Sequence, residues 1–199
     1  MRCLLLIILA ACSAETVHEG ISVGNPSLTT ITTARSAGIT LTSGQVRLNG
    51  VGVRDDDGNV FRTNVGETFD LLGNDSLEIP EGDWRRVTLH FGGDIRYQGI
   101  ADDGRTVRLQ LTVPEVRLVP EDVDLHAHGD GYVAELAFPS WLELAQPLSD
   151  VEPGSPLHDT LAQSVGDASA LYFDIDEDGE LSSEERTERA ASGSQRPSQ

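Results

Sequence analysis

At 199 residues, the chain is long enough for one domain of ordinary size with extensions and too short for two large ones. Its formal net charge of -19 at pH 7 combines 33 acidic residues with 14 basic ones, all of them arginine, which argues against nucleic acid or an anionic membrane surface as a partner and favours cations. The charge is uneven, because 18 of the acidic residues but only three arginines lie from Glu121 onwards.

The first eleven residues have the pattern of a targeting segment: Arg2 precedes an apolar run, and the letters Leu-Ala-Ala-Cys end at Cys12. Residues 1–11 are therefore predicted to be a signal peptide. The four letters resemble the lipobox of bacterial lipoproteins, which implies that Cys12 is acylated and becomes the first residue after cleavage. We expect an exported chain, lipid-anchored in the bacterial cell envelope and facing the periplasm or the exterior. An ordinary secretory signal or a short uncleaved anchor is the alternative.

Residues 12–37 are small and polar, as expected of a tether, although 28–32 has the composition of a first strand. A period of two then predicts half-buried antiparallel strands between Gly38 and Phe138. The apolar residues that alternate with polar ones are Val46, Leu48, Val51, Val53, Val87, Leu89, Phe91, Val107, Leu109 and Leu111. A mainly β domain is predicted over residues 38–150.

Turn sequences separate these strands at the spacing typical of an antiparallel β-sandwich or a barrel-like domain. They include Asp57-Gly58, Asp103-Gly104 and Asp130-Gly131. Another turn resembles the L-P-A-G-x-Y turn of a β-sandwich domain of unassigned function in bacterial surface lipoproteins. Pro80, Gly82 and Trp84 hold the matching places, and Ile79 and Glu81 are substitutions. The resemblance implies a sandwich fold and brings no site residues.

The period changes to three or four residues after Pro139, which predicts an amphipathic helix with Pro156 in its first turn. Its apolar positions are Leu157, Leu161, Val165, Ala168 and Tyr172. A second short helix is expected from Ser183 to Ala190, so that residues 151–191 form a helix-loop-helix segment. Residues 192–199 are polar and are expected to be disordered.

The loop between these helices runs from Asp174 to Glu185 and reads Asp-Ile-Asp-Glu-Asp-Gly-Glu-Leu-Ser-Ser-Glu-Glu. Calcium needs about six to eight oxygen ligands, and carboxylates at loop positions 1, 3 and 5 surround it only if the chain turns sharply at position 6, where Gly179 stands. The spacing resembles the EF-hand calcium loop. The resemblance implies Ca2+ as the cofactor, held by the side chains of Asp174, Asp176, Asp178, Ser182 and Glu185 and by the backbone carbonyl of Glu180.

This loop is single, whereas most EF-hands come in pairs, and the segment from Glu184 to Ala191 has no large apolar stripe. A structural or buffering role for calcium is therefore expected rather than a sensor's switch. The alternative is an acidic turn ahead of a capped helix, because Ser182 and Glu185 also form a Ser-x-x-Glu capping box.

Two other groups of residues are weaker candidates. One could hold a transition metal with His90, or form a solvated polar face, since its members alternate on one predicted strand: Asp124, His126, His128 and Asp130. Trp84 and Trp141 could stack a sugar, or belong to the core. The chain has no Gly-x-Ser-x-Gly elbow, no His-Glu-x-x-His motif and no phosphate-cradling glycine loop, so we expect no enzymatic activity.

These patterns together predict a non-catalytic, membrane-anchored exported lipoprotein that binds a calcium ion, with the lipid anchor at Cys12 as its contact with the membrane. The alternative is a glycan- or protein-binding module on the β domain, in which calcium only braces the tail.

Overall fold

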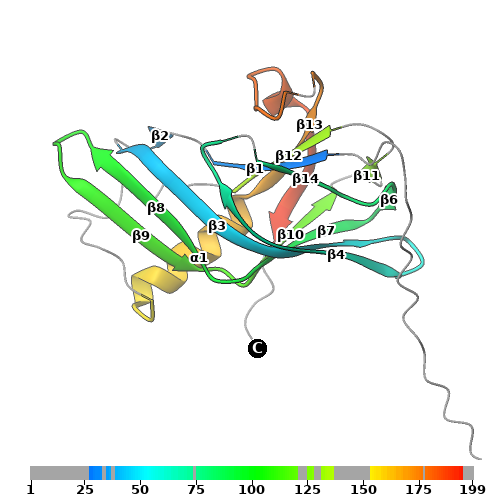
Figure 1. Cartoon of the computed structure of the whole chain (residues 1–199), viewed down its shortest axis with the longest axis horizontal. Helices are drawn as coiled ribbons and strands as arrows, with labels where there is room; N and C mark the ends of the chain where they lie inside the picture. Colours follow the sequence, from blue (N-terminus) through cyan, green and yellow to red (C-terminus); the bar gives the residue numbers. More distant parts are fainter. Residues whose placement is uncertain are drawn as a thin grey trace, which may run out of the picture.

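The computed structural model describes residues 27–32, 35–36, 39–73, 75–120, 125–127, 131–136, 153–176 and 178–194 (Figure 1). The predicted signal peptide, Cys12 and the tail from residue 195 lie outside these ranges. Over the described ranges, no helix combines the length and the hydropathy that crossing a bilayer requires.

The fold is mainly β, as predicted. The strands are β1 (Ser27–Ile31), β2 (Arg35–Ser36), β3 (Ile39–Arg54), β4 (Val60–Asp70), β5 (Ser76–Glu78), β6 (Gly82–Trp84), β7 (Arg86–Phe91), β8 (Asp94–Ala101), β9 (Thr106–Thr112), β10 (Glu115–Pro120), β11 (Leu125–Ala127), β12 (Gly131–Glu135), β13 (Ala170–Asp174) and β14 (Arg189–Ser194). Helix α1 (Pro156–Ala168) and a short 3-10 helix, η2 (Glu185–Thr187), complete the described elements. Among these residues, twelve strands form one sheet, in which β1 and β12 are parallel and the other pairs are antiparallel, while β6 pairs with β11.

The long strand β3 organises one half of the sheet. Gln45 pairs with Asp70 of β4 and with Arg96 of β8, so β8 lies along the edge of β3 opposite to β4, and β7 continues along that same edge. The strands β7 and β8 are thus one long strand bent at residues 92–93. The neighbouring strands of the sheet follow the same bend. β9 pairs with β8 and β10 pairs with β7, and the strand is interrupted between β9 and β10 at residues 113–114. The bend curls the sheet into a half-barrel (Figure 1), so the barrel-like alternative describes it better than two stacked sheets.

The other half of the sheet has the strand order β5-β1-β12-β13, and β14 lies between β13 and β10. The last described strand therefore joins the two halves. Residues 27–31, within the predicted tether, form β1, and the side chain of Leu28 is fully buried. Ser192 to Ser194, predicted to be disordered, belong to β14.

Helix α1 packs on β14, β9 and β10. It begins where predicted, since the Ser155 hydroxyl accepts a hydrogen bond from the N–H of His158 at 3.1 Å and Pro156 occupies the first turn. The buried His158 accepts the backbone N–H of Thr112 on its Nε2 atom at 2.9 Å, which ties the helix to the end of β9.

The predicted helix-loop-helix is wrong on both sides of the loop. The first helix ends at Ala168 instead of Tyr172, because residues 170–174 pair with β12 on one side and with β14 on the other. The second helix is only the 3-10 turn η2, because residues from Arg189 enter the sheet between β13 and β10. The sheet satisfies the backbone groups of both segments, which outweighs their helical patterns. The acidic loop is therefore a strand-loop-strand connection.

Candidate metal centre

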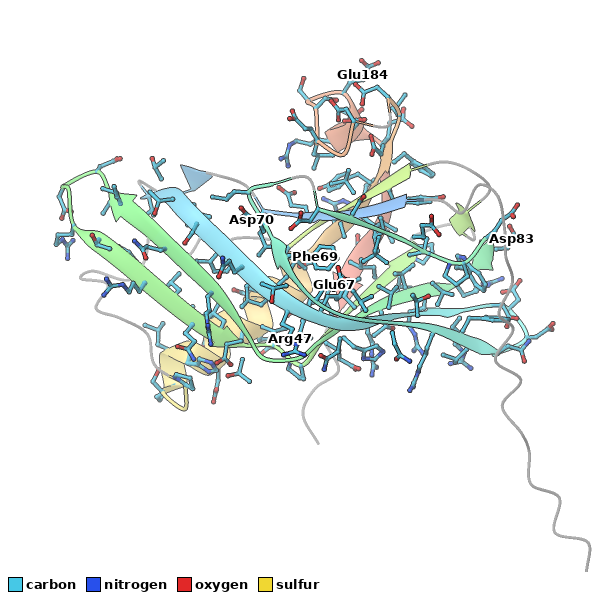
Figure 2. All side chains as sticks on the ribbon, viewed as in Figure 1. Arg47, Glu67, Phe69, Asp70, Asp83 and Glu184 are labelled. Atoms are coloured by element: carbon cyan, nitrogen blue, oxygen red, sulfur yellow. The ribbon has the colours of Figure 1, made fainter. Side chains whose placement is uncertain are left out.

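The acidic loop connects β13 to β14 and stands out from the sheet, as the position of Glu184 in Figure 2 shows. Asp174 is the last residue of β13, so the sheet determines where its backbone lies. Gly179 has a φ of +74°, the left-handed conformation that glycine adopts without steric cost, and it turns the loop back. The sharp turn expected at position 6 is present.

Three carboxylates converge inside this turn. Asp174, Asp176 and Glu185 each place one oxygen so that all three lie within 4.8 Å of one another. Because a calcium ion holds its ligands at about 2.3–2.6 Å, two oxygens that share one ion are at most about 5 Å apart. The spacing of the three oxygens therefore fits a single ion of this size.

Glu185 fastens the two ends of the loop together. Its Oε1 atom accepts the N–H of Ile175 and its Oε2 atom accepts the N–H of Ser182, both at 2.8 Å. The Ser182 hydroxyl in turn accepts the N–H of Glu185 at 3.2 Å, so the two residues form the predicted reciprocal pair, although only the 3-10 turn η2 follows, and its own N-cap residue Glu184 makes no side-chain cap bond. Each carboxylate oxygen has a second lone pair left for a cation.

Asp174 carries the least satisfied group in the loop. Its side chain is nine-tenths or more buried, with a residue exposure of 3%, and its Oδ2 atom accepts the N–H of Gly179 at 3.1 Å. Its Oδ1 atom is buried without a hydrogen-bond partner. A buried carboxylate oxygen with no donor is costly, because it has lost its water and gained nothing in exchange.

The two buried carboxylates differ in acidity. Burial raises the pKa of Asp174, and the hydrogen bond from the N–H of Gly179 lowers it. The neighbouring carboxylates of Glu185, Asp178 and Asp176 raise this pKa further. Burial also opposes the ionisation of Glu185, but hydrogen bonds from Ser182 and the backbone hold the pKa of Glu185 below its usual value. Glu185 is thus the more acidic of the two buried carboxylates, and Asp174 is the one whose ionised form its surroundings disfavour.

The remaining predicted ligands do not belong to this group of three carboxylates. The Asp178 carboxylate accepts the N–H of Glu180 at 2.7 Å, and Ser182 is engaged with Glu185. The part that Ile175 plays was not predicted, since its contribution is a backbone N–H that side-chain identity does not reveal.

The weaker sequence candidates gain no support. Trp84 is 4% exposed and its indole N–H donates to the carbonyl of Pro80 at 3.0 Å, so it belongs to the core and offers no sugar platform. His90 lies on β7, beside Glu115 of β10. Asp124, His128, Asp130 and Trp141, together with the side chain of His126, lie outside the described residues.

Comparison with known proteins leaves the family open. No family model, curated protein or solved structure matches the chain. The chemistry of the site is therefore the basis for inferring function.

Proposed function

We propose that the loop from Asp174 to Glu185 binds one calcium ion, and that the ion has a structural, non-catalytic role. The buried carboxylate of Asp174 carries this proposal, because its Oδ1 atom has no hydrogen-bond partner and one of its oxygens lies within 4.8 Å of oxygens of Asp176 and Glu185, a spacing that suits a shared cation. The ligands would be Asp174, Asp176 and Glu185, completed by Asp178, Ser182 and the backbone carbonyl of Glu180.

The donor set favours calcium over other metals. The loop offers oxygen atoms and neither imidazole nor thiolate, which disfavours zinc and copper. Magnesium demands a nearly ideal octahedron at about 2.0–2.1 Å and keeps several waters, whereas calcium accepts irregular sets of about six to eight oxygens from a flexible loop. A loop with four candidate carboxylate ligands, Asp174, Asp176, Asp178 and Glu185, around a glycine turn meets the second description better.

A structural role follows from where the loop sits. It closes the hairpin of β13 and β14, so an ion that draws Asp174 and Glu185 together joins the end of β13 to the 3-10 turn that precedes β14. The residues that follow Glu185 form a short turn and a strand, with no exposed apolar groove to switch.

The proposal includes the cell envelope as the place of action, through acylation of Cys12. Outside the cytoplasm, calcium concentrations approach the range in which extracellular modules bind, about 10⁻⁴ to 10⁻³ M. A loop of modest affinity would be substantially filled there.

The test is a calorimetric titration of the whole chain with calcium, at physiological salt with magnesium present and with mild detergent for the apolar N-terminus. We expect one site, and a melting temperature that rises with calcium because the ion binds the folded state. A hundredfold excess over Kd corresponds to about 2.7 kcal/mol of added stability.

Glu185→Gln and Asp75→Asn are the variant and its matched control. The first removes one negative charge from the loop and should abolish or strongly weaken binding, whereas the second removes one charge from the exposed turn before β5 and should leave binding unchanged. The absence of heat and of any thermal shift up to about 10⁻² M calcium would reject the proposal.

A further inference from the structure

Four arginines gather on one face of the sheet, around a shallow hollow that we call the arginine trough. A row of paired residues crosses four strands in the order Arg62 of β4, Gly52 of β3, Thr88 of β7 and Arg117 of β10. The next row along places Arg54 directly opposite Arg86. Two small residues therefore form a floor between arginines on either side.

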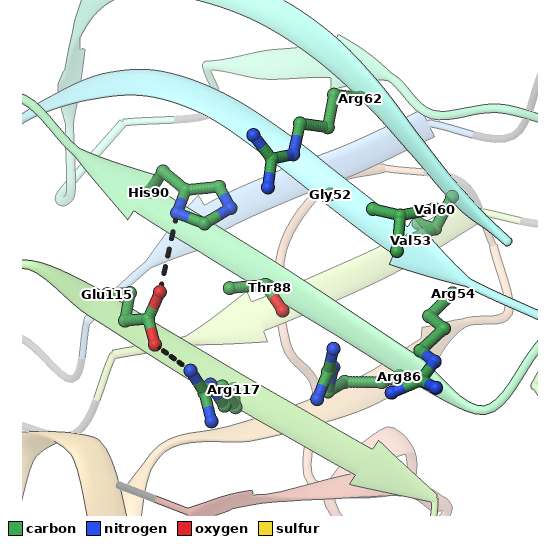
Figure 3. Close-up of a pocket in the computed structure, with 10 residues that line it drawn as sticks. All are labelled: Gly52, Val53, Arg54, Val60, Arg62, Arg86, Thr88, His90, Glu115 and Arg117. Carbon is green, nitrogen blue, oxygen red and sulfur yellow. Dashed lines mark hydrogen bonds and ion pairs between the residues drawn. The ribbon is translucent and has the colours of Figure 1, made fainter. Parts of the chain in front are cut away.

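Figure 3 shows the charged side chains surrounding Thr88. The hollow has a cavity volume of about 120 Å³, and one water needs only about 10–15 Å³ of the same kind of space. It can therefore hold a polyatomic group.

The charge of the trough is opposite to that of the chain. Four guanidinium groups line it with one carboxylate, Glu115, which pairs with Arg117 and lies 3.6 Å from His90. Burial lowers the pKa of His90. The negative charge of Glu115 raises it, and the positive charges of Arg62 and Arg117 lower it further. At physiological salt, charges beyond about 8 Å are largely screened, so a ligand in the trough meets these arginines rather than the net charge of -19.

The pairing register places like charges next to each other on this face of the sheet. Arg54 lies directly opposite Arg86, an arrangement that is destabilising unless the charges have partners, and Arg86 has one. Within the described part of the chain, no carboxylate forms an ion pair with Arg54 or Arg62, so the positive charge of the trough exceeds what Glu115 can balance.

We propose that the arginine trough binds a tetrahedral oxyanion, a phosphate monoester or sulfate group, either free or at the end of a larger molecule. Guanidinium groups donate pairs of parallel N–H bonds that match the oxygens of such a group, and charge-assisted bonds of this kind are about twice as strong as neutral ones. The small floor residues Gly52 and Thr88 let the group approach between Arg62 and Arg117. This inference is independent of the calcium loop.

The experiment titrates the whole chain with inorganic phosphate, and separately with sulfate, by calorimetry. The buffer contains a calcium chelator, so that calcium neither precipitates phosphate nor contributes binding. Two variants alter the trough in different ways. Arg62→Gln removes one exposed guanidinium, and Gly52→Val fills the floor without a change of charge, since a Cβ there would lie 3.4 Å from Nε2 of His90 and 3.8 Å from Cγ of Arg62.

Arg108→Gln is the matched control, because it removes the same charge from an exposed position on β9, outside the trough. We expect one saturable site for phosphate and for sulfate. Arg62→Gln should weaken it at least about tenfold, the loss of one charge-assisted bond, and Gly52→Val should weaken it as much, whereas Arg108→Gln should change affinity less than about twofold.

The trough is the wrong site if Gly52→Val, shown by its melting curve to be folded, binds phosphate like the original chain. An equal loss in Arg62→Gln and Arg108→Gln would mean diffuse attraction and would overturn the proposal too. So would the absence of saturable heat with both anions. A chelator in every arm keeps these outcomes separate from the fate of the calcium site.

Discussion

At the scale of single residues, the buried carboxylate of Asp174 costs stability for as long as no cation is bound. Replacing it by asparagine keeps its shape and removes the charge. In the presence of a chelator, Asp174→Asn should therefore melt a few degrees higher than the original chain, and in excess calcium the order should reverse, because the variant cannot use the ion. The measurement is thermal unfolding in both conditions.

Acid should abolish the advantage of this variant in the metal-free protein. Burial raises the pKa of Asp174, so the folded protein holds that proton more tightly than the unfolded chain does. Ionisation of Asp174 thus destabilises the fold above this pKa. The penalty shrinks as the pH falls below it and is gone below the lower pKa that Asp174 has in the unfolded chain. Asp176→Asn is the control, since that side chain is exposed and should lose calcium affinity without a gain in stability. If Asp174→Asn were less stable than the original chain both with chelator and with excess calcium, the buried carboxylate would not be a cost to the metal-free fold.

At the scale of secondary-structure elements, α1 and β14 approach so closely that only glycine fits at one point. The N–H of Gly193 donates to the carbonyl of Ser169 at 2.7 Å, and a Cβ on Gly193 would lie 2.2 Å from the carbonyl oxygen of Gly166. Gly193→Ala should lower the free energy of unfolding by about 1–3 kcal/mol, the usual cost of overpacking.

Denaturant unfolding measures this loss, and Gly93→Ala provides the comparison, since a Cβ there has no neighbour within 4 Å and its backbone is not left-handed. Equal midpoints for the two variants would show that the helix shifts freely on the strand.

The strands could be predicted from the sequence because burial alternates along them, as in β9, where Val107, Leu109 and Leu111 are buried between exposed residues. The sequence has no comparable pattern that tells which strand pairs with which. The run from Ala170 to Asp174 fits a helical period as well as a strand, and only the presence of β12 and β14 on both sides decides for the strand.

The same limit applies to the two sites. The acidic loop proposed to bind calcium is local, so its residues could be found by spacing along the chain. The arginine trough consists of residues from four strands. In the sequence, each of its arginines looks like any solvent-facing residue of a strand. Only the register reveals that Arg62 and Arg117 face each other across Gly52 and Thr88. An early signal was available in Arg86-x-Thr88-x-His90, three polar positions on one face of one strand.

At the scale of the whole molecule, β14 is the strand that connects the two halves of the sheet. It pairs with β13 of one half and β10 of the other, and α1 packs on it. A chain that stops after Glu188 should therefore lose its cooperative thermal transition, because both neighbouring strands become edges and the helix loses its support. A chain that stops after Ser194 keeps every described strand and should unfold as the full chain does. Circular dichroism on heating distinguishes these outcomes.

The position of β14 also sets the order of events during synthesis. A ribosome makes the chain from the N-terminus, and β10 emerges about 70 residues before its partner β14. Until Ser194 has left the exit tunnel, the two halves of the sheet have no strand to join them. Until then each half of the sheet ends in an unpaired strand, β13 in one half and β10 in the other.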